Sequence, residues 1–181
     1  MSRKINKIVL GVTGSIAAYK AADIVRRFQE NGCDVTVVMT KGAAEFITPL
    51  TLATLSGKNV YSDMFARGTD GQAWEMGHIE LSKADAIVVA PATANIIGKM
   101  ANGLADDFLT TLFIASRAPI FVAPSMNENM YKNAFVQANC QILKKHGVKF
   151  IEPVKGKLAC GIVGVGHLAD ADDIVRAVLK D

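Results

Sequence analysis

The sequence GVTGSIAAYK places Gly14 and Ser15 between an apolar segment, 7–12, and a stretch of helical character. Gly14 permits a tight turn, and Ser15 lies where the following helix presents free N–H groups and the positive end of its dipole, a combination that binds phosphate. The spacing matches neither the dinucleotide motif G-x-G-x-x-G nor a P-loop, so a mononucleotide such as FMN fits better than NAD or ATP. The same residues also suit an ordinary strand-to-helix turn capped by serine.

A second candidate lies in AIVVAPATANIIGKMANGLADDFLTTL, which begins as a buried strand and continues through Thr93, Ala94 and Asn95. These three residues include neither an acid nor a base. Such a loop offers backbone and amide hydrogen bonds but no catalytic group, which suits a flat, polar-edged cofactor that brings its own chemistry. The segment 40–42, at the end of another apolar stretch, would supply a hydroxyl to the same ligand.

Three further side chains could take part in chemistry. His78 precedes an apolar segment, where a lone histidine is more often structural or exposed than catalytic. Asn127, in PSMNENMY, suits a turn and helix start, but a carboxamide at a strand end would also hold a substrate carboxylate. Cys160 lies in the glycine-rich stretch 156–170, which is typical either of a mobile connection or of a lid, and its thiol would protonate a carbanion equivalent beside a flavin.

Short β-branched segments alternate with longer helical ones along the chain. The expected strands are 7–12, 34–40, 85–91, 119–124 and 149–154. The expected helices are 16–31, part of 43–56, part of 94–116, 130–146 and 171–179. Four of the strands are nearly all apolar, which indicates a parallel sheet buried on both faces. We therefore expect a single α/β domain with a doubly wound, Rossmann- or flavodoxin-like sheet and ligands at the carboxyl ends of its strands; 60–77 and 155–168 have no assignment.

Composition narrows the class of protein. The 181 residues suffice for one domain with a full core, and half of them are hydrophobic, which fits buried strands and an apolar subunit interface. A net charge of +3 does not indicate a nucleic-acid partner but is compatible with phosphate-bearing small molecules. Three widely spaced cysteines indicate neither a disulfide framework nor a metal site. With no signal peptide and no apolar run near the roughly 20 residues of a membrane span, we expect a cytoplasmic protein without membrane contact.

Four motifs in chain order carry a resemblance to a known family. GSIAAYK, PATAN, PSMNENMY and ACGIVGVGHL resemble the phosphate turn, the P-A-S-A-N-T loop, the P-x-M-N-x-x-M-W/Y motif and the substrate clamp of the homo-oligomeric flavin-containing cysteine decarboxylases. The match covers essentially the whole chain and is most similar to the members that act in coenzyme A synthesis. One departure lies in the clamp, which reads GVGHL at 164–168 where the family commonly has G-P-G-R-M.

The resemblance implies a set of site residues within one flavoprotein domain, 1–181. FMN would be bound by Gly14, Ser15, Ile16, Thr40, Lys41, Gly42, Thr93, Ala94, Asn95, Ile96 and Ser125. Asn127 would bind the substrate carboxylate, His78 would be catalytic, and Cys160 would be the proton donor of a flexible clamp at 155–168. The implied reaction is the FMN-dependent oxidative decarboxylation of 4'-phosphopantothenoylcysteine to 4'-phosphopantetheine.

The resemblance also implies partners and leaves rival functions open. The flavin would lie at the interface of a trimer or of a tetramer of trimers, and a separate phosphopantothenoylcysteine synthetase is a further implied partner. The rivals are a peptidyl-cysteine decarboxylase of lantibiotic maturation, a flavin prenyltransferase and a non-catalytic regulatory flavoprotein. Cys160 favours the coenzyme A reaction over the first rival, which does not need a clamp cysteine. PSMNENM together with His78 argues against the second, and the intact set of His78, Asn127 and Cys160 argues against the third.

Overall fold

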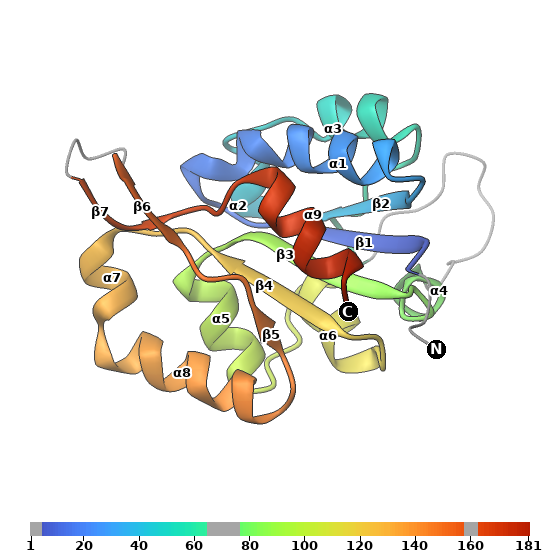
Figure 1. The fold of residues 1–181 in the computed structure, drawn as a ribbon. Coiled ribbons are helices and arrows are strands. Elements are labelled where there is room, and N and C mark those ends of the chain that lie inside the picture. The colour runs from blue at the N-terminus through green and yellow to red at the C-terminus, as the bar shows by residue number, and fades with distance from the viewer. Residues whose placement is uncertain (1–4, 65–76, 158–162) are drawn as a thin grey trace.

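A parallel five-stranded sheet forms the centre of the protein in the computed structural model, which describes residues 5–64, 77–157 and 163–181 (Figure 1). Its strands are β1 (Lys7–Val12), β2 (Asp34–Met39), β3 (Ala86–Ala92), β4 (Ile120–Pro124) and β5 (Lys149–Phe150). They lie in the order β2-β1-β3-β4-β5, and each neighbouring pair is parallel. This is the flavodoxin-like doubly wound order, so the expected fold class is confirmed.

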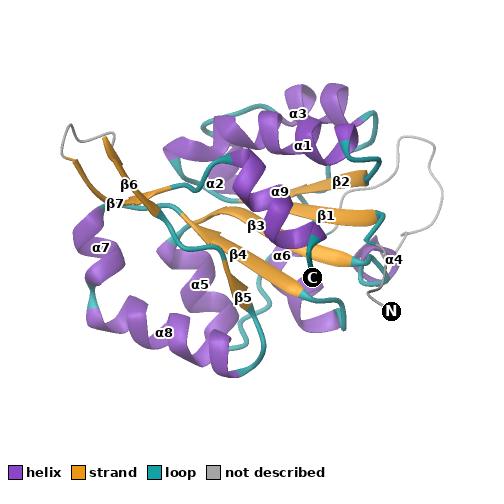
Figure 2. Cartoon of the chain, viewed as in Figure 1, coloured by secondary structure: helices purple, strands orange, loops and turns teal. Residues whose placement is uncertain are grey.

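Helices cover both faces of the sheet (Figure 2). One face carries α1 (Ala21–Glu30), α3 (Pro49–Ser56) and α9 (Ala171–Leu179), and the other carries α5 (Ala94–Ala101), α6 (Phe108–Ala115) and α8 (Ala134–Lys145). Alternate residues of each strand pack toward opposite faces: Ile8 and Leu10 belong to the first core, and Val9 to the second. Burial on both faces is the physical reason for the apolar strands. None of the helices in the described ranges is long and apolar enough to cross a bilayer.

Four short helical segments complete the framework: η1 (Ile16–Lys20), α2 (Lys41–Ala44), α4 (Gly77–Leu81) and α7 (Glu128–Lys132). The stretch 130–146, expected as one continuous helix, is divided instead, and the helical part of 94–116 consists of two helices. The stretch 94–116 breaks around Gly103, whose φ of 66° is in the left-handed region, and 130–146 breaks at Asn133, whose side chain caps α8. A left-handed glycine at Gly103 and a helix-capping side chain at Asn133 therefore interrupt the helices, although the apolar periodicity continues through both positions.

A separate antiparallel hairpin occupies most of the described part of 155–168, a stretch with no element predicted from the sequence. It consists of β6 (Val154–Lys157) and β7 (Val163–His167), with Gly156 opposite Gly164. The expected strand 149–154 was too long, because β5 ends at Phe150 and Val154 already belongs to β6. Pro153 lies between them and has no N–H to contribute to a strand pairing.

The strand order fixes where a ligand can bind. After β1 the chain turns toward the face covered by α1, whereas after β3 it turns toward the face covered by α5. Two neighbouring strands whose connections diverge in this way leave a crevice beyond their carboxyl ends. The turns after β1, β2 and β3 are therefore the place to look for a site.

Candidate active site

The carboxyl ends of β1, β2 and β3 are tied together by hydrogen bonds around a buried threonine. The Oγ1 of Thr13 donates to the carbonyl of Pro91 at 2.7 Å and accepts from the N–H of Thr93 at 3.1 Å. On the other side, the N–H of Thr40 donates to the carbonyl of Val12 at 3.0 Å. Each strand end is thus positioned relative to the other two before any ligand binds.

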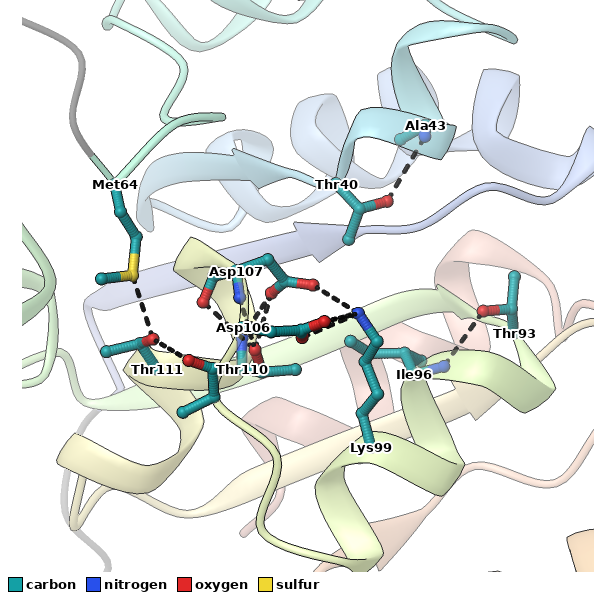
Figure 3. A network of polar contacts seen from close by, with 11 residues as sticks. Thr40, Ala43, Met64, Thr93, Ile96, Lys99, Asp106, Asp107, Thr110 and Thr111 are labelled. Carbon is teal, nitrogen blue, oxygen red and sulfur yellow. Dashed lines mark hydrogen bonds and ion pairs between the residues drawn. The ribbon is translucent and has the colours of Figure 1, made fainter.

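A hydroxyl residue caps the helical segment after each of these strands. The side-chain oxygens of Ser15, Thr40 and Thr93 accept from the N–H groups of Ala17, Ala43 and Ile96, each at 3.3 Å. Figure 3 shows the second and third of these contacts. Each cap satisfies one N–H at a helix start, where several others lack an intrahelical partner. The small polar residues of the three turns are thus explained locally by capping.

The turn after β1 touches the turn after β2 through bare backbone. A Cβ atom added to Gly14 would lie 2.9 Å from the carbonyl carbon of Gly42 and 3.0 Å from its oxygen. The expected tight turn at Gly14 is present, because the N–H of Ser15 donates to the carbonyl of Thr13 at 2.8 Å, but Gly14 does not have a positive φ, so the turn itself does not require glycine. The position requires glycine because a side chain would push the two loops apart.

A pocket of about 910 Å³ opens over these turns, within the range of roughly 300–1,000 Å³ common for small-molecule sites. Its lining includes eight of the residues proposed for the cofactor: Gly14, Thr40, Lys41, Gly42, Thr93, Ala94, Asn95 and Ile96. The other three are not among the lining residues. Ser15 and Ser125 are buried and joined by a hydrogen bond of 3.2 Å between their hydroxyls, and the Ile16 side chain is largely exposed.

Lys99, Asp106 and Asp107 also line this pocket, and the sequence reasoning missed all three. The ammonium of Lys99 lies 2.8 and 2.9 Å from the carboxylate oxygens of Asp106 and 3.3 Å from Asp107 (Figure 3). Asp107 also caps α6 in a reciprocal arrangement with Thr110. The hydrogen bond between Lys99 and Asp106 raises the pKa of the lysine and lowers that of the carboxyl group. The sequence pattern that could have pointed to Asp107 is the capping motif Asp-x-x-Thr, formed by Asp107 and Thr110 at the start of an apolar helix.

Two of the three residues proposed to act on the substrate, His78 and Asn127, lie far apart within one chain. Asn127 is the N-cap of α7, where its Oδ1 accepts from the N–H of Asn129 at 2.8 Å. His78 lies on α4, and Figure 1 shows α4 and α7 at opposite ends of the sheet. The His78 ring contacts the edge of Phe108, with centroids 6.4 Å apart, and Phe108 in turn lines the pocket. His78 does not line the pocket itself and is connected to it only through Phe108, and Cys160 lies outside the described residues.

The family model described as Flavoprotein matches residues 1–181. The chain belongs to the Flavoprotein family. A curated relative, the coenzyme A biosynthesis bifunctional protein CoaBC of Vibrio vulnificus strain YJ016, is 47% identical over 170 residues, which are 93% of this chain and 42% of the relative. The chain thus spans less than half the length of the curated relatives it matches.

Solved structures of similar proteins place this Flavoprotein-family chain more narrowly. A mutant PPC decarboxylase complexed with pantothenoylaminoethenethiol is 34% identical, with a TM-score of 0.86 and coverage of 97% of both chains. The FMN-dependent cysteine decarboxylase SpaF is 29% identical, with a TM-score of 0.77 and coverage of 96% of this chain and 97% of that one. The resemblance to the flavin-containing cysteine decarboxylases is therefore confirmed.

His167, which stands where the family clamp commonly has arginine, has a partner in this structure. The Lys20 ammonium donates to Nε2 of His167 at 2.9 Å and so links β7 to η1, the segment that follows the Ser15 turn. A neutral imidazole accepts such a bond, whereas an arginine at this position has no acceptor atom. In this member of the family, the end of β7 is held to the rest of the protein by a histidine acceptor.

We expect Lys99→Met to change the response of stability to pH. The pKa of Asp106 is lowered in the folded protein, so its ion pair stabilises the fold above the unfolded pKa of Asp and is lost as the pH falls through the folded value. The difference in unfolding free energy between wild type and Lys99→Met should therefore be largest near neutral pH and shrink below about pH 4. Urea denaturation at several pH values measures it, with Lys145→Met, at an exposed position on α8, as the control. An identical pH profile for both variants would contradict the assignment.

Proposed function

We propose that this chain is an FMN-dependent decarboxylase that converts 4'-phosphopantothenoylcysteine to 4'-phosphopantetheine in coenzyme A synthesis. The observation that carries the proposal is the pocket over the turns after β1, β2 and β3, lined by eight of the eleven residues proposed for the cofactor. The PPC decarboxylase whose structure aligns with 97% of this chain supports the substrate class. The cytoplasmic location expected from the sequence stays a prediction.

The residues present fit FMN. Gly14 and Gly42 pack backbone against backbone, which brings their two turns close enough together to contact one ligand, and the capped turns at Thr40 and Thr93 offer hydroxyl and N–H groups to a phosphate, a ribityl chain or a polar ring edge. Asn95 adds a carboxamide to the pocket lining. When bound, FMN would accept hydride from the cysteine moiety before the loss of carbon dioxide and return it afterwards.

The chain's own side chains would bind the substrate and handle its protons. Asn127 would hold the carboxylate: its Oδ1 accepts from Asn129, which orients the Nδ2 hydrogens as the donors that a carboxylate requires. His78 would hold or accept a proton, since an imidazole carries both a donor and an acceptor nitrogen. Cys160, in a clamp at 155–168, would protonate the product at the end of the cycle.

We further propose that the active form is a homo-oligomer, a trimer or a tetramer of trimers. One chain keeps α4 and α7 apart, so a neighbouring subunit would have to bring its His78 to the Asn127 of the first. Large apolar side chains follow the pocket turns and are exposed, notably Tyr19 at 57% and Leu50 at 75%. Such surfaces are typical of subunit contacts. The bifunctional relatives support a phosphopantothenoylcysteine synthetase as a second partner.

The cofactor assignment predicts one non-covalent FMN per chain, and it predicts that Gly14→Ala loses most of it. The added methyl group would meet the backbone of Gly42 and push apart the two turns that line the pocket. Gly98→Ala is the matched control, because its Cβ would meet only the Nδ2 of Asn139 at an ordinary 3.6 Å. For each variant, the absorbance of the flavin released on denaturation gives its amount, and its mass gives its identity. Release of FAD, or full FMN content in Gly14→Ala, would refute the assignment.

The reaction is tested by mass spectrometry of products made from 4'-phosphopantothenoylcysteine and, in parallel, from a cysteine-ended peptide. We expect 4'-phosphopantetheine from the first and no turnover of the second. His78→Asn should keep FMN but release no carbon dioxide, and Asn127→Asp should be inactive because its carboxylate repels that of the substrate. Turnover of the peptide alone would identify a peptidyl-cysteine decarboxylase, and no turnover of either would leave a non-catalytic flavoprotein.

A further inference from the structure

The β6–β7 hairpin lies against the segment that carries Asn127, and two hydrogen bonds join them. The N–H of Met126 donates to the carbonyl of Gly166 at 3.0 Å. Glu128 lies two residues after Met126, and its Oε1 accepts from the N–H of Val165 at 3.3 Å. The contacts come from the residues on either side of Asn127, so the position of the hairpin and the position of this asparagine depend on each other.

Alternate glycines allow the hairpin to approach this closely. A Cβ atom on Gly166, whose φ is 143°, would lie 2.2 Å from the carbonyl oxygen of Met126. A Cβ atom on Gly164 would lie 2.6 Å from Oε2 of Glu128. The first contact is with backbone, which cannot move aside, whereas the second is with the end of a flexible side chain. Bare backbone at both positions lets Glu128 reach the strand.

Glu128 is well suited to hold this contact. Its side chain is only 26% exposed, and its carboxylate also pairs with the ammonium of Lys132 at 2.9 Å. The Lys132 hydrogen bond, followed by the Val165 N–H, lowers the pKa of the carboxyl group, so it is ionised at neutral pH. A charged acceptor forms a stronger hydrogen bond with a backbone N–H than a neutral one does.

We infer that Glu128 is a positioning residue, which fixes the β6–β7 hairpin across the Asn127 segment and thereby holds Asn127 for the substrate. The inference rests on the proposed function, because it assigns Asn127 to the substrate carboxylate. Glu128 itself needs no contact with a reacting atom. Its place in PSMNENMY is one of the variable positions of the motif, so the motif alone does not single it out.

The experiment compares Glu128→Ala, Glu128→Gln and Lys132→Ala in the FMN-loaded protein. Loss of a hydrogen bond to a charged acceptor should raise the KM of Glu128→Ala for 4'-phosphopantothenoylcysteine about tenfold, with kcat and FMN content close to those of wild type. Glu128→Gln keeps an acceptor oxygen and should rescue most of the loss. Lys132→Ala removes only the ion pair and should stay close to wild type, since exposed pairs contribute little.

Hydrogen exchange of the Val165 amide gives a readout that does not depend on turnover. It should become faster in Glu128→Ala, largely recover in Glu128→Gln and remain unchanged in Lys132→Ala. Unchanged exchange in Glu128→Ala, or faster exchange with an unchanged KM, would overturn the inference. If wild type does not turn over the substrate, the proposed function fails, while the exchange measurement still decides whether Glu128 holds the hairpin.

Discussion

The parallel pairing of β1 with both β2 and β3 is the constraint on which the site depends. Because Val12 lies opposite Met39 and Gly11 lies opposite Val89, the three strands deliver their following turns to one edge. Thr13 then ties the first turn to the third. The pocket follows from this geometry: its walls are the capped starts of helical segments, held close enough together for several turns to contact one ligand.

Much of this arrangement could be predicted from the sequence, because its causes are local. Strands buried on both faces must be apolar along their whole length, so 7–12 coincided with β1 and the other main strands differed by a residue or two at their ends. Turn motifs placed after such strands have to meet at the carboxyl edge. For that reason, most residues proposed for the cofactor from GSIAAYK, the segment 40–42 and PATAN line the pocket.

The parts that could not be predicted depend on contacts between distant residues. Gly14 is required by the approach of Gly42, which is visible only once two strands are paired. Lys99 reaches Asp106 across the turn at Gly103, so a stretch that contains an uncharged loop still brings charges to the pocket. The place of the hairpin β6–β7 depends on contacts with 126–128 and with Lys20, which are distant in sequence.

The separation of His78 from Asn127 makes one claim central: catalysis needs two copies of the chain, each contributing one of these residues. The direct measurement is turnover of mixed oligomers, prepared by co-expressing His78→Asn and Asn127→Asp chains that carry different affinity tags. Some sites in such oligomers combine an intact His78 from one subunit with an intact Asn127 from another. The account predicts that the doubly purified mixture regains decarboxylation that neither variant shows alone. A mixture as inactive as its parents would contradict it.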